Sequence, residues 1–108
     1  MRRGDLVTVA ISGDYGKPRP ALVIQTDHLP ETDSVLVCLL TTAVRAAPLF
    51  RFPLTANEDT GLAQPSQVMV DKIMAVRRDR CGAPIGKVDT STMSALNRLL
   101  AFVLGIAD

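Results

Sequence analysis

The stretch GKPRPALVIQT, residues 16–26, joins a short polar turn to an apolar run. No side chain from Pro20 to Ile24 is polar, which predicts a β-strand buried on both faces. Prolines on either side of Arg19 restrict its backbone to extended conformations. An arginine fixed at the mouth of a buried strand is suited to bind a phosphate or a carboxylate. An ordinary surface arginine is the alternative, and these residues alone leave both interpretations open.

The composition indicates one packed domain that spans residues 1–108. Hydrophobic residues make up 47% of the chain against 21% charged, and the mean hydropathy is +0.22. The net charge of +1 provides no overall field that would attract a polyanion. There is no Trp, and of the aromatic side chains only Tyr15 falls in an obvious loop, so any recognition of RNA has to rely mainly on other groups.

The two cysteines and the single histidine argue against metal and cofactor chemistry. Cys38 lies in an apolar run and Cys81 in a predicted turn, which is neither a disulfide framework nor a zinc-ligand pattern. One histidine, His28, cannot form a histidine acid–base pair. We therefore expect no metal site, and because the sequence contains none of the glycine-rich motifs that bind nucleotides, no cofactor is expected either. Neither a signal peptide nor a membrane span is evident, so the predicted location is the cytoplasm.

The hydrophobic pattern predicts a mainly β protein with a C-terminal α-helix. Apolar positions recur at helical spacing after Asp89 or Thr90, either of which can cap the helix, and Gly105 is suited to end it. The fold class predicted is a small, strongly bent antiparallel barrel or sheet with the helix packed against it. The predicted strands cover residues 6–11, 20–26, 34–41, 50–54, 67–76 and 85–88, with a turn at 80–84.

A few polar residues at strand ends or inside apolar strands are the candidates for chemistry. Thr41 and Thr42 close one strand, although hydroxyl residues can also simply end a strand. In a regular strand, the adjacent Asp71 and Lys72 point to opposite faces, so one of them should face inward or into a cleft. An inward charge needs a partner, for which Arg19 is a candidate, and a purely structural ion pair is the competing interpretation.

In these motifs the sequence resembles the MazF/PemK toxins. The resemblance extends over nearly the whole chain and implies the small SH3-like barrel of the CcdB/MazF-like toxin fold. The matching segments, in the family's order, are 3–7 (RGDLV), 18–24 (PRPALVI), 40–42 (LTT), 61–62 (GL), 65–68 (PSQV), 70–73 (VDKI) and 84–88 (PIGKV).

The resemblance implies the toxin half of a type II toxin–antitoxin pair that inhibits growth by cutting RNA. Such toxins are metal-independent endoribonucleases (mRNA interferases) that cut single-stranded RNA at short sequences. The ribose 2′-OH attacks the adjacent phosphorus, which leaves a 2′,3′-cyclic phosphate and a 5′-OH. The implied partners are single-stranded mRNA as substrate, a cognate antitoxin and a second copy of the chain in a homodimer, without a membrane.

The resemblance also carries over residue roles. Arg19 matches the family's key arginine and Thr41 its key hydroxyl, while Asp71 matches the aspartate proposed as the base in the PemK branch. Guanidinium stays protonated in proteins, so Arg19 is assigned to stabilise charge rather than to act as a base. The PemK branch has an arginine two residues before the aspartate, where this chain has Met69.

The turn before Arg19 departs from the family pattern. Many members carry Gly-Ser-Glu-Gln there, whereas residues 13–17 are shorter and contain no glutamate. Asp14 is a candidate substitute for the missing carboxylate, Tyr15 for stacking on a base, and Lys17 for a phosphate contact. The full set of expected RNA-binding residues is Tyr15, Lys17, Thr42, Lys72 and Arg77.

Two other functions remain open. The related CcdB toxins poison gyrase through the end of their C-terminal helix, which Leu104-Gly105-Ile106 loosely resembles, although the tryptophan of CcdB is absent. A non-catalytic homologue that serves as an interaction module is the third possibility.

Overall fold

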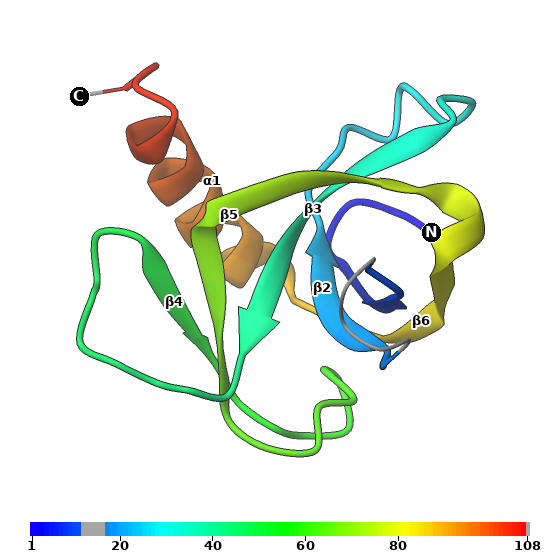
Figure 1. Cartoon of the computed structure of the whole chain (residues 1–108). Helices are drawn as coiled ribbons and strands as arrows, with labels where there is room; N and C mark the ends of the chain where they lie inside the picture. Colours follow the sequence, from blue (N-terminus) through cyan, green and yellow to red (C-terminus); the bar gives the residue numbers. More distant parts are fainter. Residues whose placement is uncertain (12–16, 108) are drawn as a thin grey trace.

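The computed structural model describes residues 1–11 and 17–107. Within them, the strands form one antiparallel sheet in the order β4-β5-β3-β2-β1-β6, with a helix packed on one face (Figure 1). The prediction of a mainly β fold with a C-terminal helix is confirmed. The strands β4 and β6 are the two edges of the sheet and do not pair with each other. The elements are β1 (Asp5–Val9), β2 (Arg19–Val23), β3 (Ser34–Thr41), β4 (Arg51–Leu54), β5 (Ser66–Arg77), the 3₁₀-helix η1 (Arg78–Arg80), β6 (Cys81–Lys87) and α1 (Thr90–Val103).

Both faces of the sheet are buried, because the side chains of each central strand alternate between two hydrophobic clusters. In β2, Leu22 joins the cluster that contains Leu96 and Leu100 of α1, here called the helix-side cluster. Ala21 and Val23 join the far-side cluster on the other face. The predicted double-sided burial of this strand is therefore confirmed. The remaining buried members of the far-side cluster are Val7, Val9, Val35, Val37 and Val76.

The prediction of a turn at residues 80–84 is wrong from Cys81 onward. Residues from Cys81 onward form β6, which pairs with β1, and Pro84 lies opposite Val7. The pairing shifts register twice, so β6 is an irregular edge strand. Edge strands and bulges tolerate a proline because it has no N–H to donate to the ladder. The glycine and the proline that predict a turn in this segment therefore lie in a strand.

The helix α1 begins and ends close to the predicted positions. Asp89 is the N-cap, and Gly105 has a φ of +75°, the left-handed conformation that suits a residue just beyond a helix. Leu96 and Leu100 are buried. Leu104 lies just beyond Val103, the last residue of the helix, and is exposed.

Replacing Asp89 by alanine is expected to lower the melting temperature at neutral pH. The Asp89 carboxylate accepts hydrogen bonds from the Thr92 N–H (2.7 Å) and the Ser91 hydroxyl (3.1 Å), which lower its pKa below the ordinary value of 3.8. A lowered pKa means that this stabilisation is present above pH 3.8 and is lost as the pH falls through the folded-state value. Thermal unfolding of Asp89→Ala and wild type should therefore differ at pH 7 and converge in acid. The exposed Glu58→Gln should show no such difference at pH 7.

Candidate active site

Arg19 and Thr41 lie at the same end of neighbouring strands. Ala21 of β2 is opposite Leu39 of β3, and Arg19 and Thr41 are each two residues farther toward that end. Residues two apart in a strand share a face, so both belong to the far side of the sheet from α1. We call this region, where β2 begins and β3 ends, the Thr41 end of the sheet (Figure 1).

Pro20 accounts for the opening between the two strands at this end. The β1–β2 ladder continues to Arg19, whereas the β2–β3 ladder stops at Ala21. A proline has no N–H to donate to a ladder, which explains why the second pairing ends there. The guanidinium of Arg19, on an exposed residue, and the half-buried Thr41 therefore flank a gap in the sheet pairing.

The hydroxyl of Thr41 is held in a defined position. Its Oγ1 accepts a hydrogen bond from the Ala43 N–H at 3.0 Å. A threonine hydroxyl has one proton to donate and two lone pairs to accept, so this bond leaves the proton available. Thr41 can thus donate to an oxygen of a bound phosphate without losing its contact with Ala43.

The expectation that Asp71 or Lys72 faces inward is wrong, because both are exposed. The β3–β5 pairing jumps from Leu40–Val68 to Cys38–Ile73, so four residues of β5 lie opposite the single Leu39. This irregularity turns both charged residues to solvent and avoids the cost of burying a charge. Regular pairing, on which the expectation relied, does not exist at this point.

Asp71 lies inside the irregular stretch of β5, opposite Leu39 of β3. Val70 packs in the helix-side cluster and so does Ile73, three residues farther on, so the alternation of faces is broken between them. Gln67, the residue of β5 that pairs with Thr41, is four residues before Asp71. The structure therefore brings Arg19 and Thr41 to one face at the Thr41 end, and places Asp71 as an exposed carboxylate farther along the neighbouring strand β5.

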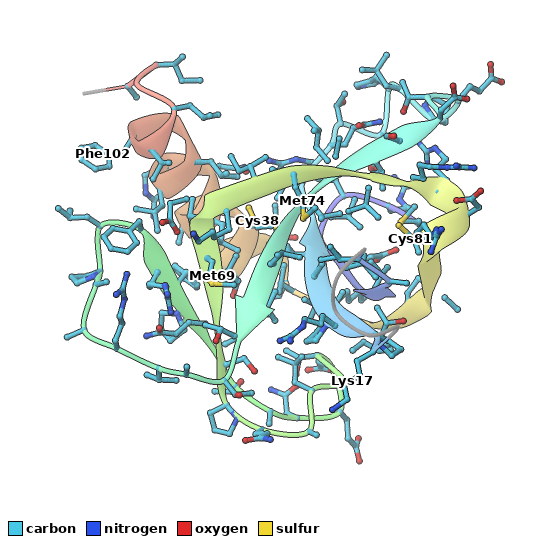
Figure 2. The ribbon with its side chains drawn as sticks, viewed as in Figure 1. Lys17, Cys38, Met69, Met74, Cys81 and Phe102 are labelled. Carbon is cyan, nitrogen blue, oxygen red and sulfur yellow. The ribbon has the colours of Figure 1, made fainter. Side chains whose placement is uncertain are left out.

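The remaining predicted contacts divide into near and distant ones. Lys17 is exposed two residues before Arg19 (Figure 2), and Thr42 is exposed next to Thr41. Arg77 is opposite Ser34 at the other end of β3 and forms an ion pair with Asp79 at 2.5 Å. At about 3.3 Å per residue, the length of β3 separates it from Thr41 by about 23 Å. Tyr15 and Asp14 lie outside the described residues.

Sequence reasoning missed a buried amide beside this site. Gln67 of β5 pairs with Thr41 in the sheet, and only 7% of its surface is exposed. Its side chain bonds to the loop that follows β3. In the sequence, Gln67 is recognisable only as a polar residue at the start of an apolar strand. That pattern does not reveal which contacts its side chain makes.

The thiol of Cys38 is not a candidate nucleophile. Burial raises its pKa from 9.0 to about 12, the negative charge of Asp71 adds to the shift, and the positive charge of Arg3 opposes it. Cys38 is only 1% exposed. The reactive thiolate is therefore absent at neutral pH.

Iodoacetamide at pH 8.5 is expected to modify Cys81 of the native protein and to leave Cys38 intact. Burial also raises the pKa of Cys81, but this residue is only half-buried, whereas Cys38 is almost completely buried. Mass spectrometry should find one label on the native chain and two after unfolding, while native Cys81→Ser should take none. Labelling of Cys38 as fast as that of Cys81 would contradict the burial described above.

The described residues offer no metal site of their own. Within residues 1–11 and 17–107, no three His, Cys, Asp or Glu side chains gather closely enough to hold a metal ion. No helix in the described part of the chain has both the length and the apolar character needed to cross a membrane.

A bent sheet with an arginine and a hydroxyl at the ends of two neighbouring strands has groups of the kind that bind a phosphate. Residues 2–104 match the family of PemK-like, MazF-like toxins of type II toxin–antitoxin systems. The chain belongs to this family, which confirms the resemblance found in its sequence.

Individual relatives agree with this assignment. The chain is 42% identical over 108 residues to the probable endoribonuclease MazF of Mycolicibacterium smegmatis, with 99% of each chain covered. The Mycobacterium tuberculosis toxin MazF-mt6 superposes with a TM-score of 0.82 at 26% identity, covering 96% of this chain and 98% of that one. A mycobacterial endoribonuclease in complex with its cognate antitoxin shares the fold, with a TM-score of 0.80 at 24% identity and 100% and 98% coverage.

Proposed function

We propose that the protein is a metal-independent endoribonuclease toxin that cuts single-stranded mRNA in the cytoplasm and thereby inhibits growth. The proposal rests on two findings. Residues 2–104 match the toxin family, and a relative with 42% identity is named as a probable endoribonuclease MazF. The placement of Arg19 and Thr41 on one face at the Thr41 end supports the proposal, as does the exposed carboxylate of Asp71 on the neighbouring strand β5.

The three residues have complementary roles in the proposed reaction. The RNA 2′-OH attacks the adjacent phosphorus, and Asp71 accepts its proton. Arg19 neutralises charge on the phosphorane oxygens with its planar fork, and Thr41 donates a hydrogen bond to a further oxygen. The bond from phosphorus to the 5′ oxygen breaks, and after protonation of that oxygen the products are a 2′,3′-cyclic phosphate and a 5′-OH.

The RNA contacts form a local set around this centre. Lys17, Thr42 and Lys72 are exposed near Arg19, Thr41 and Asp71 in the sequence and can bind flanking phosphates. Tyr15 is proposed to stack on a base. Arg77 contacts the RNA only if the strand continues to the opposite end of β3.

The proposed assembly is a homodimer inhibited by an antitoxin. Several apolar side chains are exposed at the end of α1 and just beyond it, namely Phe102, Leu104 and Ile106. Such side chains favour contact with protein partners. An acidic antitoxin segment laid across the Thr41 end would compete with RNA for Arg19.

The SH3-like barrel is the proposed finer description of the fold. Figure 1 shows β5 arching across the sheet and continuing through η1 into β6, which pairs with β1. The strands β1, β2, β3, β5 and β6 thus curve around the far-side cluster.

Incubation of the purified protein with total RNA in EDTA tests the proposed function. We expect cleavage with 5′-OH termini, because the reaction needs no metal. Intact RNA would contradict the proposal. Trapped gyrase–DNA complexes under parallel conditions would favour the CcdB-like alternative, and the absence of both effects would favour an interaction module.

A further inference from the structure

The side chain of Gln67 holds the backbone of one residue in the loop 42–50, which connects β3 to β4. Its Oε1 accepts a hydrogen bond from the Arg45 N–H at 3.2 Å, and its Nε2 donates to the Arg45 carbonyl at 2.9 Å. A single buried amide therefore pairs with both backbone polar groups of Arg45, in the way a neighbouring strand would. The loop itself is mostly exposed and has no regular secondary structure.

Arg51 provides a second link from the same amide to this loop. Its Nη1 donates to Gln67 Oε1 and to the Ala43 carbonyl, both at 3.3 Å. The N–H of Ala43 in turn donates to Thr41 Oγ1 at 3.0 Å. A continuous series of hydrogen bonds therefore runs from Gln67 through Arg51 and Ala43 to the hydroxyl assigned to the phosphate.

We propose that Gln67 is a positioning residue for RNA cleavage, which fixes the loop 42–50 through Arg45 and Arg51 and so orients the Thr41 hydroxyl. The inference rests on the proposed function, since it concerns the geometry of that reaction. Small displacements of a catalytic group cost rate, so a buried clamp behind an exposed loop has a direct effect on turnover. It also fixes the backbone of Arg45, whose guanidinium lies 5.4 Å from the centre of the Phe50 ring.

A double-mutant cycle between Gln67→Met and Thr41→Val separates positioning from general stability. Methionine keeps the length of the glutamine side chain and removes its hydrogen bonds. We expect Gln67→Met to lower kcat by about tenfold with little change in KM. In the Thr41→Val background, the same substitution should lower kcat by less than about twofold, because the hydroxyl that it orients is gone.

Thr60→Val is the matched control for loss of buried hydrogen bonds. Thr60 is also 7% exposed, and its hydroxyl bonds within the loop 55–62, to Thr55 and Asn57, rather than to the loop 42–50. It should lower stability without changing kcat below the unfolding temperature. Wild-type kcat in Gln67→Met, or an equal loss in both Thr41 backgrounds, would overturn the proposal.

Amide hydrogen exchange tests the clamp without any activity. The N–H groups of Ala43 and Arg45 should exchange at least about tenfold faster in Gln67→Met than in wild type, while that of Val88, which donates to the Gly4 carbonyl at 3.0 Å, should be unchanged. Unaltered exchange at both loop amides would refute the clamp even if RNA is cleaved. If the wild type fails to cleave RNA while the exchange rates change as expected, the proposed function fails and the loop-fixing role of Gln67 stands.

Discussion

Replacing Arg19 by alanine is expected to lower kcat for RNA cleavage by about 100-fold or more. The guanidinium is the only strong cation assigned to the charge that develops on the phosphorane oxygens, and water substitutes poorly for a fixed donor. Because Arg19 is exposed, the substitution should leave the fold intact. Single-turnover cleavage of a defined RNA, with circular dichroism and thermal unfolding in parallel, measures both effects.

Two further variants sharpen this result. Arg19→Lys keeps the charge but loses the planar fork, so its kcat should fall between those of wild type and Arg19→Ala. Arg2→Ala removes another exposed arginine, which pairs with Asp27 at 3.2 Å, and should cleave within about twofold of wild type because surface ion pairs contribute little. Undiminished cleavage by folded Arg19→Ala would refute the assigned role.

Replacing Gly86 by alanine is expected to destabilise the protein by about 3 kcal/mol, since the added Cβ would overlap backbone atoms and force the backbone to move. A Cβ built at Gly86 would lie 2.2 Å from the backbone of Thr60. The contact is reciprocal, because a Cβ at Gly61 would lie 1.9 Å from the carbonyl oxygen of Ile85. Here β6 and the loop 57–62 touch backbone to backbone, and the Lys87 N–H donates to the Asp59 carbonyl at 2.8 Å.

Gly105→Ala is the matched control for this substitution. A Cβ at Gly105 would have no atom within 4 Å, so only its left-handed backbone, with φ +75°, opposes a side chain. The expected cost is about 1 kcal/mol. In urea, the free energy of unfolding should therefore be clearly lower for Gly86→Ala than for Gly105→Ala. Similar values for the two variants would contradict the close contact.

The sequence predicts best where burial follows a simple period. The apolar run from Pro20 to Val23 lies in β2, whose side chains enter both clusters, and Asp89 caps the helix as expected. The order of the matching segments along the chain identifies the family correctly. Arg19 and Thr41 at strand ends are predictable candidates for the same reason, because the apolar runs define where the strands begin and end.

The remaining features depend on contacts between distant segments. The irregularity that exposes Asp71 and Lys72 follows the last β4 pair at Met69, where β5 loses its register with β3, and no local pattern reveals it. The edge position of β6 decides that Cys81 and Pro84 belong to a strand. The proposed role of Gln67 depends on its hydrogen bonds to Arg45 and Arg51, and hydrogen bonds of this kind leave no periodic signal.

Cleavage of a matched pair of oligonucleotides tests the central claim most directly. One member is RNA that contains the mapped cut site, and the other carries a single 2′-deoxynucleotide on the 5′ side of the cleaved bond. In EDTA, we expect the all-ribose strand to give 2′,3′-cyclic phosphate and 5′-OH ends and the deoxy-substituted strand to remain intact at that bond. Equal cleavage of both strands would contradict attack by the 2′-OH and with it the roles assigned to Arg19, Thr41 and Asp71.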